Sequence, residues 1–519
     1  MDAIRLKNYR CFSDTGQIKL QPVNILLGKN SVGKSSFLKF FPLLKQSRVK
    51  HPNGIFLWYA DDVDFKDFKN TVKNGEGNIE IEFHFQRKFD DALTSSKSKK
   101  IQNVGITVIL TLSGHPKDEN LDYLSNLKIS FEDISIELSF NPMDDKKFYH
   151  PLKGIKINEN PIEVPVGIIP QLSDDGFIPR LLFQHDEEDN TAYLPFPNIE
   201  YEYDLHELLN NMESMLKFPP RSTYRWRYYR SSGELADTYK SLPKKQVKQF
   251  KTVERFIENV YLTQLNNIIE DINTYIDDLA RNIFYIQPVR ANAKRYYRFQ
   301  NLAVDEIDSH GDNLPMYLNS LSKGAMDSLN EWIEPFFKFR LQVRPKEGHI
   351  QINITETETD QNKTPMMRNL VDVGFGYSQL LPIIVQIWNA LRNDNIKNTA
   401  LRKKLNNPKI IVIEQPELHL HPRMMSFFAK MLFSLIKDGK KNVRFIIETH
   451  SETLIEALGR YIIQDNNNHT DTKSIDPEAF QILIFNKQQG DTGTSISATR
   501  YNNNGLIERW PYGFFSGRN

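Results

Sequence analysis

Cysteine is almost absent from this sequence, and so are long apolar runs. Cys11 is the only cysteine among 519 residues, so one chain can form neither an internal disulfide nor a zinc site of several thiolates. The first residues lack the apolar core of a signal peptide, and the longest apolar runs, such as residues 379–388, are too short to span a bilayer. We therefore expect a cytoplasmic protein with no membrane contact.

An excess of charge of either sign is also missing. The chain has 66 basic and 65 acidic side chains, a formal net charge of +1, so its overall electrostatics do not predict binding to nucleic acid or to an anionic membrane. Any such contact requires a local patch. Apolar residues at 39% and charged residues at 25% are typical of soluble globular proteins, and the length allows two or three domains of about 100–200 residues.

Residues 28–35 read Gly-Lys-Asn-Ser-Val-Gly-Lys-Ser and match the phosphate-binding P-loop pattern G-x-x-x-x-G-K-[ST] at every position. The apolar run 23–27 predicts a buried strand before this loop, and apolar residues at helical spacing over 35–44 predict a helix after it. Backbone N–H groups of such a loop surround phosphate oxygens, and the helix N-terminus adds positive partial charge. We expect Lys34 to reach the β- and γ-phosphates of ATP and the Ser35 hydroxyl to bind Mg²⁺. The residues expected to contact the nucleotide from this loop are Gly28, Asn30, Ser31, Gly33, Lys34, Ser35 and Ser36.

Two further apolar runs end in polar side chains. Residues 409–413 predict a buried strand that ends in the carboxylate of Glu414, as a Walker B strand does, and we expect Glu414 to hold Mg²⁺ directly or through water. Residues 445–447 predict another strand, which leads to His450 as the expected sensor of the γ-phosphate. His419 and His421 between them could instead suggest zinc, but the order of the motifs favours an ATP site.

Residues 371–379, Val-Asp-Val-Gly-Phe-Gly-Tyr-Ser-Gln, precede a helix expected over 380–391. Small residues at a helix N-terminus leave amides exposed for a phosphate. The loop resembles the signature loop of ABC-type ATPases, which implies contact with the γ-phosphate of ATP held by a second copy of the chain. The candidates for this signature loop are Gly376, Ser378 and Gln379. A glycine-containing helix cap without any nucleotide contact is the alternative.

With these motifs the chain resembles the ABC-type ATPases of the overcoming-lysogenization-defect (OLD) and SMC group. More narrowly, it resembles the bacterial defence ATPases of Septu, PARIS and some retron systems. The segments that carry the resemblance are 8–12, 28–35, 374–379, 414–422, 449–451 and 510–515. The resemblance implies an α/β fold with a mixed sheet and flanking helices, head-to-head dimers driven by ATP, higher homo-oligomers, and control of a separate toxic effector.

A split head domain with an insertion is the organisation that we expect. Apolar and polar residues alternate over 79–85, 106–112 and 127–140, which predicts an antiparallel sheet, and apolar spacing over 205–216 and 247–283 predicts helices. The expected parts are the first piece of the ATPase head at 1–60, a mainly β lobe at 61–200, a helical insertion at 201–285, and the second piece of the head at 286–519.

Gln415 departs from the ABC pattern, which usually has a glutamate base directly after the Walker B acid. An amide cannot accept a proton from water, so either Glu417 supplies the base or Gln415 only positions the water. Slow hydrolysis of ATP follows from both alternatives. A scaffold that ATP merely gates, with little hydrolysis, is the competing function.

The absence of some features separates the remaining functions. Subtracting 450 from 519 leaves 69 residues after His450, too few for the metal-dependent nuclease domain of OLD nucleases, so we expect a separate chain, a nuclease, to be the effector. No sustained heptads support an SMC-like DNA-repair ATPase.

Arginines interleave with aromatic residues over 221–230, a pattern that suits either contact with nucleic acid or a packed core. Two glutamines, Gln46 and Gln86, are candidates for the Q-loop.

Overall fold

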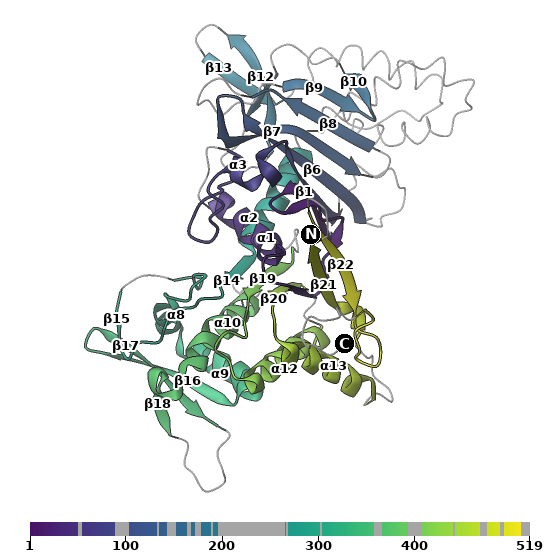
Figure 1. Ribbon diagram of the computed structural model, residues 1–519. Coiled ribbons are helices and arrows are strands. Elements are labelled where there is room, and N and C mark those ends of the chain that lie inside the picture. Colours follow the sequence, from purple (N-terminus) through teal and green to yellow (C-terminus); the bar gives the residue numbers. More distant parts are fainter. Residues whose placement is uncertain are drawn as a thin grey trace, which may run out of the picture. The chain divides into compact units, whose positions relative to one another are not determined.

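The computed structural model describes most of the chain as two compact units (Figure 1). The first unit comprises Met1–Leu6, His51–Ile55 and Asp67–Asp277, and the second comprises Lys7–Lys50, Phe56–Lys66 and Asp278–Asn519. The described residues are 1–49, 54–88, 103–131, 134–142, 152–162, 168–171, 178–187, 190–195, 265, 268–300, 304–357, 366–392, 407–439, 442–467, 475–487 and 493–509. The predicted helix 205–216, the basic segment 221–230 and the segment 510–515 lie outside them.

An antiparallel sheet dominates the first unit and confirms the predicted alternation. Its neighbouring strands are β10 (Asn160–Ile162), β9 (Leu152–Ile157), β8 (Ile134–Phe140), β7 (Asp118–Phe131), β6 (Asn103–His115) and β5 (Ile79–Lys88), in that order. Ile79, Ile81 and Phe83 are buried while the residues between them are partly exposed, because successive side chains of a strand point to opposite faces. The alternation over 127–140 belongs to two strands, since β7 ends at Phe131 and β8 begins at Ile134.

Smaller elements complete the described part of the first unit. They are α3 (Phe68–Thr71), η1 (Lys73–Gly75), and a three-stranded sheet of β11 (Ile168–Gln171), β12 (Arg180–Glu187) and β13 (Asn190–Pro195). Residues 268–281 are helical, which confirms part of the helix predicted over 247–283. The predicted end at residue 283 is wrong, because Ile283 is the first residue of a strand, β14 (Ile283–Ile286). The helix crosses the boundary between the units, which lies between residues 277 and 278.

A mostly parallel sheet lies at the centre of the second unit. Its order is β14 (Ile283–Ile286), β19 (Lys409–Glu414), β20 (Val443–Glu448), β4 (Val23–Gly28), β21 (Phe480–Lys487) and β22 (Thr494–Arg500). The first five strands are parallel and β22 is antiparallel to β21. Every residue of β4 and β19 is buried, as expected for parallel strands covered on both faces, whose sequences are continuous apolar runs.

Helices and a second, smaller sheet complete the second unit. The helices are α1 (Lys34–Leu38), α2 (Phe40–Val49), α8 (Leu314–Ser320), α9 (Lys323–Phe337), α10 (Phe375–Arg392), α12 (Pro422–Lys437) and α13 (Glu452–Asn467), with the short turns η2 (Leu370–Val373) and η4 (Pro477–Ala479). The second sheet contains β15 (Tyr297–Arg298), β17 (His349–Glu356), β16 (Phe339–Lys346) and β18 (Met367–Asn369). The N-terminal strands are β1 (Ala3–Tyr9), whose residues up to Leu6 belong to the first unit, and β2 (Phe12–Asp14) and β3 (Ile18–Lys19) of the second unit.

One continuous apolar core joins the central sheet to its helices. Ile25 of β4, Ile411 of β19 and Ile447 of β20 belong to it, together with buried faces of α8, α9, α10, α12 and α13. α12 and α13 lie side by side (Figure 1). Among the described helices, none combines the length and the apolar character needed to cross a bilayer.

α10 begins earlier than the sequence predicts. The helix starts at Phe375 rather than at Leu380, so the proposed signature residues lie in its first turns. Gly374, with φ of 101°, provides the sharp turn into the helix. Tertiary contacts stabilise the early start, because the Tyr377 ring packs edge-on against Phe339 at 5.3 Å between centroids and its hydroxyl donates to Glu356.

Candidate functional site

The carboxyl ends of three parallel strands bring the predicted motifs to one edge of the central sheet. The P-loop follows β4, Glu414 ends β19, and Glu448 ends β20. β20 lies between the other two, with Glu448 opposite Glu414 on one side and opposite Leu26 on the other. Ligands of open parallel sheets bind at this edge, so the fold places the motifs where a ligand is expected.

Lys34 lies inside the P-loop. Its side chain is buried, and its ammonium donates to the carbonyl oxygens of Gly28 and Lys29, both at 2.9 Å. Asn30 and Ser31 remain exposed at the tip of the loop. Burial lowers the pKa of Lys34, and the negative charge of Glu448 opposes this effect. The loop therefore surrounds a buried cation and leaves its tip free to meet a ligand.

A side chain at Gly33 would be strained and crowded in this loop. The φ of Gly33 is +102°, and a methyl group there would lie 2.2 Å from the Sγ atom of Cys11.

We predict that Gly33→Ala destabilises the protein by about 2–4 kcal/mol, the sum of backbone strain and overpacking. Gly16→Ala is the matched control, because Gly16 has φ of +66° but nothing within 4 Å, and should cost about 1 kcal/mol. Thermal unfolding of both variants measures the difference, and equal losses would contradict the close contact with Cys11.

Glu448 is a site residue that sequence reasoning missed. The Ser35 hydroxyl donates to its carboxylate at 2.8 Å, and the Lys34 ammonium lies 3.8 Å from its other oxygen. The carboxylate is buried, so these partners replace the water that it has lost. The available signal was a carboxylate at the end of an apolar strand, two residues before His450.

Glu414, the predicted Walker B acid, faces a tyrosine. One of its carboxylate oxygens accepts a hydrogen bond from the Tyr285 hydroxyl at 2.7 Å. Burial raises the pKa of Glu414 and the charge of Glu448 adds to the rise, whereas Lys39 and the bond from Tyr285 oppose it. Burial also raises the pKa of Tyr285, so the tyrosine keeps its proton and acts as the donor. Sequence reasoning gave Tyr285 no role.

Glu417 ties the loop after β19 to the loop after β20. One of its oxygens accepts from the Thr449 hydroxyl and the other from the backbone N–H of His450, both at 2.7 Å. Gln415 adopts a left-handed conformation with φ of 42°, and its N–H donates to the Glu448 carbonyl at 2.8 Å. Residues in such sparsely populated conformations often lie at functional sites, because the surrounding contacts must hold them there.

His450 is half-buried, and this burial, together with the positive charge of Lys34, lowers its pKa below the ordinary 6.5, although Glu417 and Glu448 oppose the shift. The unfolded chain therefore binds a proton at higher pH than the folded protein does. The free energy of unfolding should decrease as pH falls from 6.5 towards the folded-state pKa.

We predict that His450→Asn removes this part of the pH dependence. Urea unfolding of both proteins at about pH 8 and about pH 5.5 measures it, and the wild type should lose more stability than the variant. Glu414, whose pKa is raised, changes stability in the opposite direction but is present in both proteins, so its effect cancels. Identical losses in the two proteins would contradict a neutral His450.

Arg290 is a second residue without a role in the sequence analysis. Its buried guanidinium donates to the carbonyl oxygens of Gln287 at 3.2 Å and Gln415 at 3.4 Å. Its own carbonyl accepts a hydrogen bond from the Gln379 side chain at 3.3 Å. Burial lowers the pKa of Arg290 to about 10, while Glu417 opposes this. Arg290 therefore links the loop after β19 to α10.

The candidates for a signature loop have partners within the second unit. Ser378 is buried and donates to the Phe375 carbonyl at 2.7 Å, and Gln379 is buried beside Arg290. A side chain at Gly376 would lie 3.2 Å from the His419 carbonyl, so the start of α10 packs closely on the loop after β19. Phe375 is exposed and meets the His419 ring edge-on at 4.8 Å.

The other candidates have structural partners. Gln46 bonds through its side-chain amide to the backbone of Leu57 and Val63. His421 caps α12 by accepting the N–H of Arg423 at 3.2 Å. Gln86 is exposed on β5 in the first unit. Arg295, in the segment Lys-Arg-Tyr-Tyr-Arg at residues 294–298, forms a bidentate pair with Asp372.

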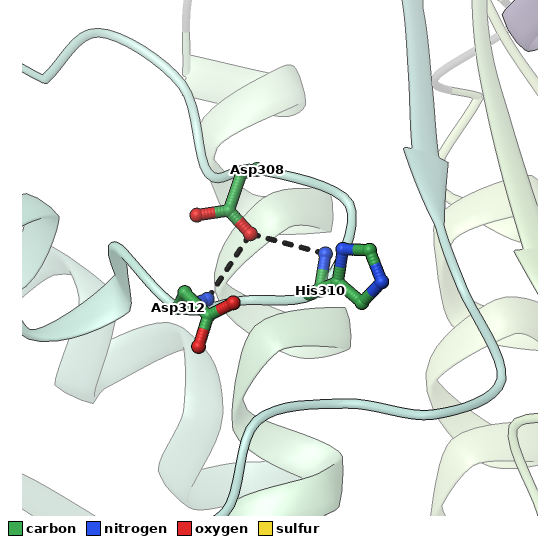
Figure 2. Close-up of side chains that lie close together, drawn as sticks. All are labelled: Asp308, His310 and Asp312. Carbon is green, nitrogen blue, oxygen red and sulfur yellow. Dashed lines mark hydrogen bonds between the residues drawn. The ribbon is translucent and has the colours of Figure 1, made fainter. Parts of the chain in front are cut away.

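Asp308, His310 and Asp312 form the group of three potential metal ligands found among the described residues. Figure 2 shows the Asp308 carboxylate facing the backbone of the other two. It accepts the N–H groups of His310 and Asp312, both at 3.0 Å, and of Asn313 at 2.8 Å. These bonds shape the turn before α8 and account for the cluster without a metal.

The donor atoms at the sheet edge fit MgATP. A hydroxyl group and two carboxylates are hard oxygen donors of the kind that Mg²⁺ prefers, and they come from Ser35, Glu448 and Glu414. The ammonium of Lys34 and the exposed loop tip suit phosphate groups.

The chain is similar to two nucleases of known sequence. The chain is 23% identical over 435 residues to Endonuclease GajA of Bacillus cereus (strain HuB5-5). The aligned region covers 75% of this chain and 57% of that protein. The chain is also 22% identical over 205 residues to Old nuclease of Escherichia phage P2. This aligned region covers 38% of this chain and 33% of that protein. The chain thus spans between a third and three fifths of the length of these relatives.

Solved structures of SMC head domains align with the chain along its length. The head from Pyrococcus furiosus, solved with the C-terminal domain of ScpA, covers 96% of this chain and 95% of its own at 10% identity and a TM-score of 0.31. The head from Thermotoga maritima covers 96% and 97%, at 10% identity and a TM-score of 0.29.

The family itself is given by a match of the AAA ATPase domain model to residues 1–455, most of the chain. The predicted fold class, an α/β fold with a mixed sheet and flanking helices, is confirmed. The chain belongs to the AAA ATPase domain family and is distantly related to Endonuclease GajA and Old nuclease.

Proposed function

We propose that the chain binds MgATP at the carboxyl edge of its central sheet and hydrolyses it slowly, as the sensor and scaffold subunit of a bacterial anti-phage defence system. The observation that carries this proposal is the meeting of Lys34, Ser35 and Glu448 within hydrogen-bonding or ion-pair distance, beside Glu414 and His450. Family membership supports the ATPase activity.

Each residue of the site has a role that its contacts support. Lys34 binds the β- and γ-phosphates, and Ser35 with a carboxylate holds Mg²⁺, which neutralises the charge of the phosphates when it is bound. His450, which is neutral at pH 7, donates to or accepts from the γ-phosphate and its water. These residues act by electrostatic positioning and form no covalent intermediate.

Slow turnover follows from the residues around the attacking water. Gln415 cannot accept a proton, and both of its backbone groups are held, the N–H by Glu448 and the carbonyl by Arg290. Glu417 has the chemistry of a base, but its two oxygens already accept hydrogen bonds from Thr449 and His450. A long-lived ATP-bound state suits a sensor better than a motor.

We further propose that ATP joins two copies head to head, with the exposed start of α10 facing the partner copy's nucleotide. The assembly controls a separate effector, a nuclease, in the cytoplasm, as in the Septu, PARIS or retron-associated systems. The names of the relatives, an endonuclease and a nuclease, support a link to nucleic-acid cleavage. Nucleic acid is also a proposed ligand of the segment 221–230.

Assembly and defence can be tested in two experiments. Light scattering of the purified chain with and without MgATP should show a larger species with the nucleotide, and Lys34→Ala should not respond. In cells that carry the chain with its neighbouring genes, the wild type should reduce phage plating and Lys34→Ala should not. Equal plating with both proteins would contradict the defence role.

A scaffold gated by ATP without appreciable turnover is the second candidate, and Gln415 favours it. This function predicts that MgATP binds and assembles the wild type while phosphate release stays at the level of Lys34→Ala. Assembly and hydrolysis measured in the same sample distinguish the two functions.

A further inference from the structure

We propose that Glu448, rather than the Walker B residue Glu414, is the carboxylate that acts with Ser35 on the magnesium ion of bound ATP. The inference rests on the proposed function and assigns the metal-binding role to a residue that the motif pattern passes over.

Ser35 and Glu448 are in direct contact. The serine hydroxyl has one hydrogen and two lone pairs, and the hydrogen is donated to Glu448 at 2.8 Å. The lone pairs are therefore directed away from the carboxylate and can bind a cation. The same bond fixes the hydroxyl rotor, so Ser35 is oriented before the ligand arrives.

The strand order places Glu448 nearer to the P-loop strand than Glu414. β20 is the neighbour of β4, and Glu448 lies level with Leu26, near the start of the P-loop. Glu414 is on β19, one strand further out. Because strands are about 4.8 Å apart, Glu414 starts roughly 10 Å from the P-loop strand and Glu448 starts at half that distance.

Glu414 has a hydrogen-bond partner on the other side of its strand. Its carboxylate accepts from Tyr285 at 2.7 Å, and Tyr285 belongs to β14, which flanks β19 on the side opposite β20. This bond engages one oxygen of Glu414 from the side of β14. Glu414 is a positioning residue in this arrangement, and Glu448 has the direct contact.

Charge gives the assignment a measurable consequence. Glu448 lies 3.8 Å from the only buried ammonium of the P-loop, Lys34, so it adds negative charge where phosphates must bind. Without magnesium that charge repels ATP, and with magnesium it attracts the metal cation of the complex. Removing the charge should therefore change the two affinities in opposite directions.

The test is equilibrium binding of a fluorescent ATP analogue, in Mg²⁺ and in EDTA, to the full chain. Glu448→Gln should weaken binding in Mg²⁺ by about tenfold or more and strengthen it in EDTA by about threefold. Glu414→Gln should keep most of the preference for Mg²⁺, and Glu452→Gln, an exposed carboxylate at the start of α13, should match the wild type in both buffers.

A double variant separates the specific contact from general damage. If Glu448 acts through Ser35 and the ion, the loss of affinity in Ser35→Ala/Glu448→Gln is smaller than the product of the two single losses. Thermal unfolding shows whether each variant folds. Glu448→Asp keeps the charge on a shorter side chain, so it should retain part of the Mg²⁺ preference. It takes the place of Glu448→Gln in the test if that variant does not fold.

The outcomes are distinct. Loss of the Mg²⁺ preference in Glu448→Gln but not in Glu414→Gln supports the proposal. The reverse result, or an equal loss in both variants with multiplicative effects in the double variant, overturns it while the ATP site itself stands. Failure of the wild type to bind the analogue in either buffer overturns the proposed function, and this inference with it.

Discussion

Replacing Lys34 with alanine should lower the affinity for MgATP by about 100-fold or more. The side chain is buried, and its ammonium closes the P-loop by donating to Gly28 and Lys29. Alanine removes a charge-assisted partner of the phosphates and leaves those carbonyl oxygens and the Glu448 carboxylate without it. Isothermal titration with MgATP measures the affinity, where 100-fold corresponds to about 2.7 kcal/mol.

Lys29→Ala is the matched control for this prediction. Lys29 belongs to the same loop and has the same side chain, but it is exposed, and its contact with Lys34 is made by its backbone carbonyl. Its replacement should change the affinity by no more than about threefold. Equal losses in Lys29→Ala and Lys34→Ala would mean that net charge near the loop matters and the buried ammonium does not.

Replacing Glu417 with glutamine should lower kcat by about 100-fold or more and leave the affinity for MgATP within about threefold. An amide cannot take the proton of the attacking water. It also places an NH₂ group beside either the His450 N–H or the Thr449 hydroxyl, which both donate to Glu417. A loss confined to kcat indicates an interaction made in the transition state.

Gln415→Ala and Glu452→Gln complete that experiment. Gln415→Ala should reduce kcat far less than Glu417→Gln, because the backbone contacts of Gln415 with Glu448 and Arg290 do not need its side chain. Glu452→Gln exchanges the same groups on an exposed residue and should match the wild type. If Gln415→Ala is inactive and Glu417→Gln is not, Gln415 positions the water and Glu417 is not the base.

Local pattern was sufficient to find the elements that carry the chemistry. The apolar run 23–27 corresponds to β4, and the run that ends at Glu414 corresponds to β19. Buried parallel strands have continuous apolar sequences, so both their position and their class can be predicted. The alternation at 79–85 predicted β5 for the complementary reason, since one face of its sheet is buried.

Long-range pairing was not predictable from local pattern. Glu448 and Ser35 are 413 residues apart in sequence, and they meet because β20 lies between β4 and β19. Tyr285 and Arg290 reach the site from β14 and the segment after it, which no motif identifies. The early start of α10 likewise depends on Tyr377 packing against Phe339, a contact between distant segments.

The proposed function depends on hydrolysis of MgATP at the edge built by Lys34, Ser35 and the two glutamates. Steady-state phosphate release by the purified wild type, measured beside Lys34→Ala in the same buffer, tests it most directly. We expect slow release by the wild type that is clearly above the variant and disappears in EDTA. Release that is the same in both proteins, or that persists in EDTA, would contradict it.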